Sequence, residues 1–181
     1  MTDTLPTASS KSWLQTYYYL RAGVAIAWVA AAFTIGKTQP IAGALLVIYP
    51  AWDALANVLD AQRNGGLVKA PSQALNALVS TLTAVAMAVA VSRDMRAVAV
   101  VFGGWAILAG LLQLATALRR MKAGAQWTMI LSGLQSALAG GYFASLAFKP
   151  AEPAMADLAP YAAFGALWFA VAAILLTFRR R

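Results

Sequence analysis

The chain has 181 residues, of which 61% are hydrophobic and only 11% are charged, and its formal net charge is +8. A soluble domain is closer to half apolar and about a quarter charged, so this chain has too few polar residues to cover a core in water. It contains no cysteine and no histidine. Disulfides, thiolate catalysis, histidine-dependent triads and histidine-based zinc sites are therefore excluded.

Six apolar runs are candidates for crossing a bilayer, whose hydrocarbon core of about 30 Å needs roughly 20 helical residues. We predict six transmembrane helices, at residues 20–36, 41–59, 74–92, 97–118, 127–148 and 158–178. Their short connections favour antiparallel neighbours in one compact all-α bundle. A cleaved signal peptide is the alternative for the first run, but the roughly 20 residues before it are long for the charged segment of such a peptide.

The two ends of the chain differ from the predicted transmembrane domain, residues 20–178. Residues 1–19 are predicted to form a cytoplasmic tail. Within it, Ser12 to Tyr19 are predicted to form an interfacial helix that leads into the first span, because Trp13 and Tyr17 to Tyr19 favour the headgroup layer. A stacking platform for nucleic-acid bases is the alternative, and the adjoining run of lipid-spanning length argues against it. Residues 179–181 form a basic C-terminus that we also place in the cytoplasm.

The basic residues are distributed unevenly between the two sides of the predicted bundle. Ten of the 14 Lys and Arg residues fall on the side that carries both termini, and four fall on the other side. By the positive-inside rule both termini are cytoplasmic, which requires an even number of spans. The same rule accounts for the net positive charge, so we expect membrane lipids and not nucleic acid as partners.

Three of the predicted spans share a local pattern, in which an aromatic residue is followed by proline or small residues and then by tryptophan. The pattern occurs at residues 49–52, 102–105 and 164–168. It predicts three tandem helical hairpins, since internal repeats are common in membrane proteins. Chance recurrence in an Ala-rich apolar sequence is the alternative.

The second span carries a carboxyl group, Asp53, a little past its middle. A charged side chain at the centre of a span costs about 2.5–3.5 kcal/mol on insertion scales, so such residues usually face the interior of a bundle. Asn57 lies on the same helical face, and Pro50 leaves a backbone carbonyl of the preceding turn without its helical donor. Together these residues predict a polar pocket for a proton or a small polar ligand.

Asp53 has no basic residue at its own depth in the predicted spans. Arg21 and Arg63 lie near the predicted interface and would have to reach inward along the helices. The sequence therefore favours a neutral Asp53 over a fixed salt bridge. Asp60, two turns further along the same helix, is predicted at the cytoplasmic boundary near Arg63.

Other polar side chains occur at a similar depth in the third, fourth and fifth spans. The candidates for a shared site are Asn76, Gln113 and Gln135, with Ser80, Ser132 and Ser136 nearby. One interpretation is that they form hydrogen bonds across helices and hold the bundle together. The other is a cavity for an ion, a proton or a small polar molecule. The sequence leaves both interpretations open.

Small residues recur at every fourth position of the fifth span, as Gly133, Ala137 and Gly141. This spacing lets helices approach closely, so it predicts tight packing at the centre of the bundle or at the interface of a homo-oligomer. A high content of Ala and Gly is the alternative explanation.

An ordered set of residues along nearly the whole chain resembles the HdeD family of small six-span bacterial inner-membrane proteins. The residues that carry the resemblance are Leu20, Arg21, Ala22, Gly23, Pro40, Tyr49, Asp53, Gly104, Trp105, Gly110, Gln113, Arg119, Arg120, Trp127 and Gly133. The chain departs from the family pattern at Ala22 and Ala54, where the family often has glycine. The resemblance implies a bacterial inner-membrane location and, as for some members, a link to acid resistance. It implies no catalytic residues.

Two functions follow from these observations. The first is an HdeD-like role in acid or envelope stress through a polar site around Asp53. The second is a small transporter or channel subunit for protons, ions or a small polar solute. An enzyme is not expected, because intramembrane catalysis normally needs His, Cys, paired carboxylates or a metal cluster, and Asp53 and Asp60 lie at different depths. No cofactor or metal is predicted, and the six Met residues are assigned to packing.

Overall fold

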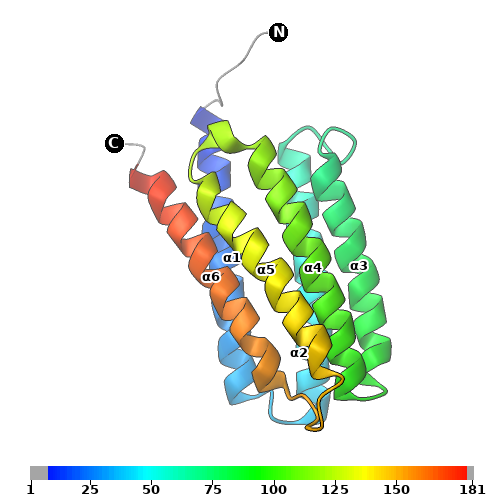
Figure 1. Cartoon of the computed structure of the whole chain (residues 1–181). Coiled ribbons are helices and arrows are strands. Elements are labelled where there is room, and N and C mark those ends of the chain that lie inside the picture. The colour runs from blue at the N-terminus through cyan, green and yellow to red at the C-terminus, as the bar shows by residue number, and fades with distance from the viewer. Residues whose placement is uncertain (1–7, 179–181) are drawn as a thin grey trace.

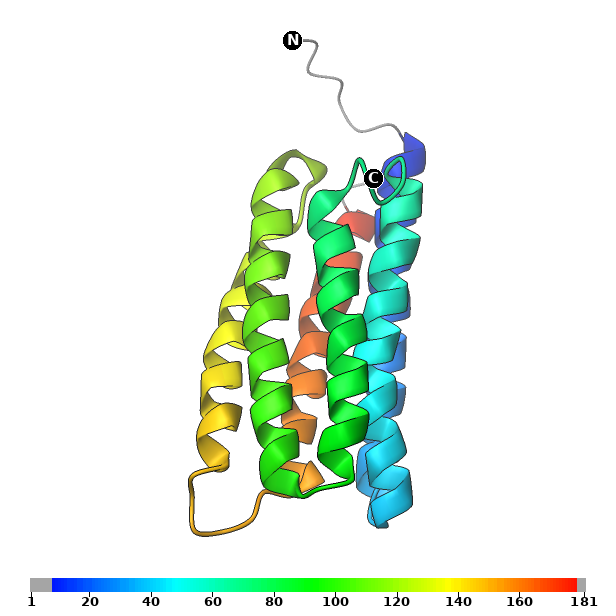
Figure 2. The same cartoon turned by 90° about the vertical axis from the view of Figure 1, so that its right-hand side faces the viewer.

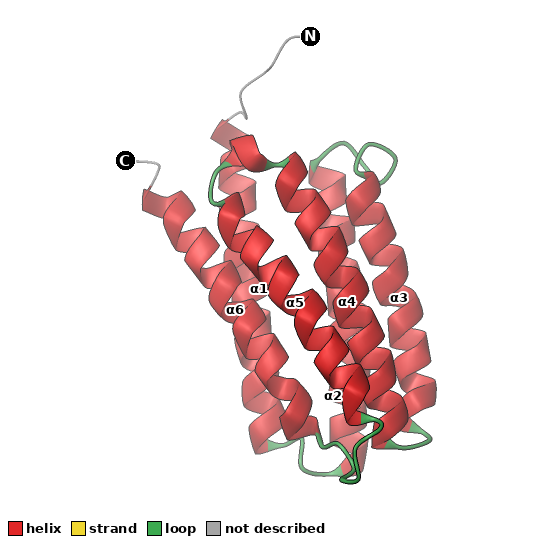
Figure 3. Ribbon diagram, viewed as in Figure 1, coloured by secondary structure: helices red, strands yellow, loops and turns green. Residues whose placement is uncertain are grey.

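The computed structural model describes residues 8–178, and the side chains from Ser12 onward except that of Ala123. This part of the chain is helical throughout apart from its turns (Figure 3). The helices are α1 (Ala8–Thr34), α2 (Gln39–Arg63), α3 (Pro71–Val91), α4 (Met95–Arg119), the short 3-10 helix η1 (Met121–Ala123), α5 (Gln126–Leu146) and α6 (Met155–Phe178). The predicted all-α architecture is confirmed, while residues 1–7 and 179–181 of the predicted tails lie outside the described residues.

The six long helices stand side by side with alternating directions, so both ends of the described chain lie at one end of the bundle (Figures 1 and 2). The α2–α3 and α4–α5 connections lie at this same end, which we call the terminal end. The other three connections lie at the opposite end. This arrangement agrees with the predicted antiparallel neighbours joined by short loops.

Local sequence sets several of the helix boundaries. Pro71 begins α3, where its missing N–H removes no helical bond. Asp94 caps α4 by accepting a hydrogen bond from the backbone N–H of Ala97 at 2.7 Å. Between α2 and α3, Gly65 and Gly66 both have φ above +90°, a conformation that glycine adopts without steric cost.

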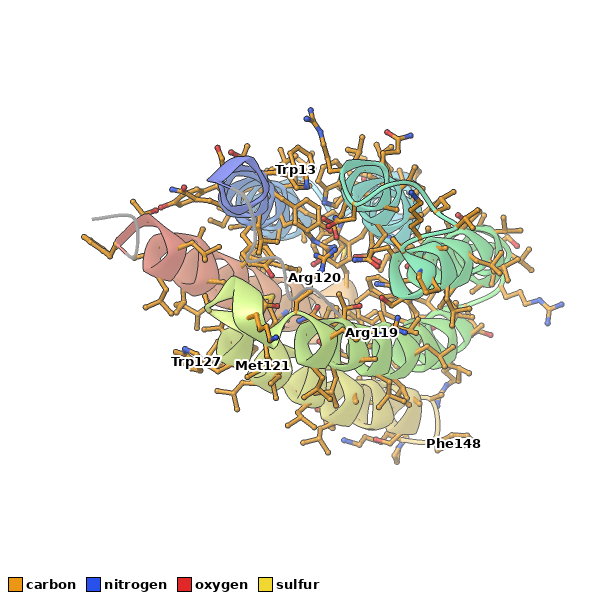
Figure 4. The ribbon with its side chains drawn as sticks, turned by 90° about the horizontal axis from the view of Figure 1, so that it is seen from above. Trp13, Arg119, Arg120, Met121, Trp127 and Phe148 are labelled. Atoms are coloured by element: carbon orange, nitrogen blue, oxygen red, sulfur yellow. The ribbon has the colours of Figure 1, made fainter. Side chains whose placement is uncertain are left out.

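Helices α2 to α5 pack most against their neighbours in chain order, whereas α1 and α6 pack most against each other. The six helices therefore form a closed ring around an interior (Figure 4). The most extensive packing joins α4 to α5, α1 to α6 and α2 to α3, whereas α1 and α2 share little contact. The tandem hairpins predicted from the repeat would join α1 to α2, α3 to α4 and α5 to α6, and the contacts do not confirm this arrangement. The ring closes between the first and last helices.

The surface and the interior have the reverse of a soluble protein's polarity. Large apolar side chains such as Leu82, Val85 and Leu138 are exposed along the outside of the bundle. Carboxylates, amides and hydroxyls are buried inside it; those of the first four helices are Asp53, Asn57, Asp60, Gln73, Asn76, Ser80 and Thr83. Lipid is the solvent in which this distribution is stable, because apolar side chains then lose nothing by exposure.

Four helices, α2, α3, α4 and α6, are both long enough and apolar enough to cross a membrane. The chain is therefore an integral membrane protein by the character of its helices. The other two helices, α1 with 27 residues and α5 with 21, have sufficient length but more polar residues. In α1 these residues are concentrated in the first half of the helix, and in α5 several of them face the interior.

Close backbone contact joins α4 and α5 along a row of glycines. A Cβ atom added to Gly110 would lie 2.6 Å from the carbonyl oxygen of Gly133, and one added to Gly140 would lie 2.5 Å from that of Gly103. The predicted close-packing residues Gly133 and Ala137 lie on this face, within one chain. Gly141 does not, since nothing lies within 4 Å of a Cβ built there. Gly140 lies seven residues after Gly133, and seven residues turn a helix to within about 20° of two full turns. Gly141 lies eight residues after Gly133 and overshoots two turns by about 80°, so Gly140 and not Gly141 faces α4.

Aromatic rings fill the interior toward the end opposite the termini. Phe102, Phe143 and Tyr161 meet edge to face with ring centroids 5.3–5.9 Å apart, a geometry favoured by their quadrupoles. Trp105 packs against Phe102 and Tyr161 on the side toward the terminal end. The apolar residues buried around these rings include Leu46, Met87, Val98 and Leu158. This cluster closes one half of the bundle, and the polar groups occupy the other half.

Candidate intramembrane binding site

An ion pair lies about midway along α1 and α2. Arg21 donates from one Nη to Asp53 Oδ1 and from the other to the hydroxyl of Tyr17 at 3.0 Å. Its guanidinium also lies 4.5 Å from the centre of the Phe169 ring, close enough for a cation–π contact. Both charged groups are therefore held inside the bundle, where a pair is far less costly than either charge alone.

The predicted absence of a counter-ion for Asp53 is wrong, and the case for a neutral Asp53 rested on it. The error comes from the separation of the first span, predicted from Leu20, from an interfacial helix over residues 12–19, whereas α1 is one continuous helix from Ala8. The residues before Leu20 add roughly 18 Å of the same helix on the terminal side. Arg21 therefore lies near the middle of α1, level with Asp53 on α2.

Hydrogen bonds connect Asp53 to α3 and α4. Asp53 Oδ2 accepts from Ser80 Oγ at 2.7 Å and from Asn57 Nδ2 at 3.2 Å. The indole N–H of Trp105 donates to Ser80 Oγ at 2.9 Å. One buried network therefore joins α1, α2, α3 and α4, and such networks rigidify a core when their members are satisfied.

A second buried carboxylate, Asp60, lies two turns closer to the terminal end. Arg120 pairs with its Oδ2 at 2.8 Å, and Gln73 Nε2 donates to the same oxygen at 3.1 Å. Asp60 Oδ1 accepts from Asn64 Nδ2 at 3.0 Å and from the indole of Trp13 at 3.3 Å. Four donors from α1, the C-terminal end of α2, α3 and the α4–α5 connection therefore surround one carboxylate.

This second pair was missed by the sequence reasoning, which placed Asp60 at the boundary near Arg63. Arg63 instead lies over the ring of Trp13, 4.8 Å from its centre. Figure 4 shows Arg120 above the interior of the ring and Trp13 at its rim, between α1 and α2. The available signal was the spacing of Asp60 from Asp53, because residues seven apart share a helical face.

Two small cavities lie along this polar half of the bundle. The inner one, of about 40 Å³, is bordered by all six helices and contains the Arg21–Asp53 pair in its wall. The outer one, also of about 40 Å³, lies next to the Asp60–Arg120 pair. Each has room for about two or three water molecules. Both cavities are lined by Arg21, Asn76, Gln113 and Phe169, so the two form one polar column.

One side chain in this column has unused hydrogen-bonding capacity. Asn76 Oδ1 is buried and has no hydrogen-bond partner among the described residues. Leaving a buried acceptor unpaired costs about 1–3 kcal/mol, so such atoms are rare without a function or a bound partner. Gln113 lies across the cavities and donates weakly to the Met129 carbonyl at 3.3 Å. Asn76 lines both cavities, so the unpaired oxygen belongs to a residue of their shared wall.

The predicted site residues divide between this column and its surroundings. Asn76 and Gln113 line both cavities, Asp53 lines the inner one and Asn57 the outer one. Pro50 lies buried in α2 one turn before Asp53 and lines neither cavity. Gln135 faces α6 instead, where its Oε1 accepts from the indole of Trp168 at 2.6 Å.

The charges of the column balance, because two arginines face two carboxylates. A neutral or zwitterionic polar molecule, water or a proton suits such a site better than a simple ion. Among the described residues no group of three or more His, Cys, Asp or Glu side chains could hold a metal ion. A buried charge in a membrane bundle indicates a candidate functional site, since polar amides would hold the helices together at lower cost in free energy.

The fold and the buried polar column define an integral membrane protein with a charged core. Residues 75–145 match the family model described as a short repeat of unknown function (DUF308), the repeat found in HdeD-like membrane proteins. The predicted resemblance is thereby confirmed. No curated protein and no solved structure matches the chain.

The matched segment runs from α3 to the end of α5 and so includes the glycine contact between α4 and α5. It also contributes Asn76, Ser80 and Gln113 to the polar column. Arg21, Asp53 and Asp60 lie outside it, on α1 and α2.

Proposed function

We propose that the chain is a six-span protein of the bacterial inner membrane, with both termini in the cytoplasm, that acts in acid or envelope stress. Its polar column takes up a proton or a small polar solute beside Asp53. Six spans are supported by the length of α1 and α5 and by the inward placement of their polar groups. The distribution of Lys and Arg supports the orientation.

The observation that carries this proposal is the ion pair of Arg21 and Asp53 beside a cavity with an unpaired Asn76 oxygen. A purely structural network would leave no acceptor unused and would need no charge. We propose binding and not catalysis, because the chain has no His or Cys and its two deep carboxylates are each paired with arginine.

A cytoplasmic entrance is supported by the asymmetry of the bundle. The polar column extends from the inner cavity toward the terminal end, where Arg120 and Asp60 line the outer cavity. On the other side the aromatic cluster of Phe102, Phe143 and Tyr161 fills the interior. These features support the proposal that a solute reaches Asp53 from the cytoplasmic side.

A small transporter or channel subunit is the second candidate. It is favoured by the two cavities, which share four lining residues and follow one another along the interior of the bundle. Transport also requires the aromatic cluster to open, so it involves a second conformation. Proton flux into proteoliposomes driven by a pH gradient tests this candidate: flux that Asp53→Asn abolishes supports it, and its absence from the wild type contradicts it.

The proposed stress role is tested by acid challenge of a deletion strain that carries wild type, Asp53→Asn, Glu152→Gln or an empty vector, with membrane abundance measured by immunoblot. Glu152 is an exposed carboxylate at the opposite end of the bundle, so Glu152→Gln is the matched control. We expect wild type and Glu152→Gln to restore survival and Asp53→Asn at equal abundance to fail. Equal survival of all four strains contradicts the stress role.

A further inference from the structure

A groove of about 390 Å³ runs between α5 and α6 on the side of the bundle. It extends from Ser132 and Trp168 to Tyr142 and Ala156, or roughly 15 Å along the helices. Tyr142 and Phe164 in its walls are about half exposed. With the helices placed in a bilayer as proposed above, this groove opens toward the acyl chains and not toward water.

The groove adjoins the inner polar cavity. Four residues line both spaces: Ser132, Ser136, Tyr161 and Gly165. Three of these residues, Ser132, Ser136 and Tyr161, carry hydroxyl groups, so the shared wall has polar side chains. At Gly165 the wall is thin, because a Cβ atom built there meets only the Tyr49 hydroxyl, 3.8 Å away. A molecule in the groove can therefore direct one end toward the cavity that contains Arg21 and Asp53.

The lining specifies the chemistry of an occupant. None of the residues that line the groove is Lys or Arg, and Asp157 lies at its far end, so an anion is disfavoured. A molecule without any polar group makes no hydrogen bond to the hydroxyls of the inner wall or to the amide N–H groups of Gln135, whose oxygen already accepts from Trp168, and hydrogen-bonding capacity left unused in lipid costs free energy. A volume of this size is at the lower end of the range for small-molecule pockets and is too small for a two-chain phospholipid.

We propose that the α5–α6 groove is a lateral binding site for a small uncharged amphiphile, a molecule with one apolar chain and one hydroxyl or un-ionised carboxyl group. The apolar chain lies against Tyr142 and Phe164, and the polar group bonds to Ser132, Ser136 or Tyr161. This proposal rests on the membrane placement proposed above. It adds an entrance from the lipid to the cytoplasmic entrance of the polar column.

Photolabelling of the full chain in liposomes tests this site. The probe is a medium-chain aliphatic alcohol that carries a diazirine, and labelled residues are mapped by mass spectrometry. We expect labels to concentrate on Tyr142, Phe164 and Tyr161. An alkane of equal length without the hydroxyl should label Tyr161 about fivefold more weakly, because it lacks one hydrogen bond.

Gly165→Leu is designed to fill the shared wall, and Gly141→Leu is its matched control on the exposed, open side of α5. We expect Gly165→Leu to lose the label on Tyr161 while Phe164 stays labelled, and Gly141→Leu to keep both. If Gly165→Leu does not fold, Ala139→Phe fills the groove from the α5 side and should remove the labels from Tyr161 and Phe164.

Three outcomes overturn the proposal. Labels spread over all lipid-facing residues, including Val85 and Leu138, in proportion to exposure mean that the groove is ordinary lipid surface. Protection of the groove together with cross-links between α5 or α6 of two chains means that a second copy covers it. Equal labelling of Tyr161 by the alkane and the alcohol means that the polar wall does not contribute to binding. These readouts do not depend on acid survival or proton flux, so the site can fail while the proposed function holds.

Discussion

The two buried ion pairs use the same residue types and take their carboxylates from the same helix, two turns apart. Asp60 is surrounded by four donors, and its partner Arg120 comes from the connection between α4 and α5 at the terminal end. Asp53 lies deeper, in the wall of the inner cavity, and accepts from Ser80 and Asn57 beside its partner Arg21. Asn76, whose oxygen has no partner among the described residues, lines the cavities beside both pairs. The two pairs therefore differ in depth and in the donors that surround the carboxylate, and not in their distance from this unused acceptor.

The deeper pair should show the largest effect on stability. We expect Asp53→Leu or Arg21→Met alone to lower the free energy of unfolding by about 3–5 kcal/mol, because each leaves one buried charge without its partner. The double variant should recover most of this loss, since no charge is then left unpaired. Unfolding of the purified variants in detergent measures these free energies. A double variant as unstable as the single ones contradicts the expectation.

The glycine contact between α4 and α5 should be the next most sensitive feature. Gly140→Leu is expected to cost about 1–3 kcal/mol or more, because even its Cβ would meet the backbone of α4. Gly141→Leu, one residue later, has open space and should change little. Unfolding midpoints of the two variants decide this, and equal losses from both would show that helix propensity and not close packing governs the position.

The pair near the terminal end should be more tolerant than the deeper one. We expect Asp60→Asn to cost about 1–2 kcal/mol, because an amide keeps part of the hydrogen bonding and Arg120 is partly exposed and can turn to water. Comparison of its unfolding midpoint with that of Asp53→Asn measures the difference. A larger loss of stability for Asp60→Asn than for Asp53→Asn would contradict the expectation that the deeper pair is the less tolerant one.

Asn76 should have the smallest effect on stability. Asn76→Leu removes an acceptor that has no partner, so we expect a change within about 1 kcal/mol. The same variant should fail to restore survival in the acid challenge, because the cavity loses its free acceptor. A stable variant with full survival would mean that the unpaired oxygen is not used by a ligand.

The helices could be predicted from the sequence because apolar runs of membrane-spanning length fix them directly. The main error concerns the start of the first span, because the aromatic and polar residues 12–19 predict a separate interfacial helix, whereas α1 is one continuous helix from Ala8. That error moved Arg21 to the interface and removed the counter-ion of Asp53. Depth along a helix therefore depends on where the helix begins, which hydropathy alone does not reveal.

The candidate site was predictable only in part, because a polar residue in a span can face more than one direction. Asn76 and Gln113 face the cavities, whereas Gln135 faces α6. The turn of the α5 helix explains Gln135, which lies about 60° from the direction of Ser132. Gly141 was misplaced for the same reason, since the direction of each residue around the helix decides its neighbours. Sequence spacing gave the depth of these residues but not the helix that each one meets.

The measurement that tests the central claim most directly is acid survival of a deletion strain that carries the double variant Arg21→Met/Asp53→Leu at wild-type membrane abundance. The double variant separates the two roles of the pair, because it should fold without the charges. If the pair serves a proton or a polar solute, the double variant is stable and does not restore survival. Full survival with the double variant would show that the pair only stabilises the bundle, which contradicts the account.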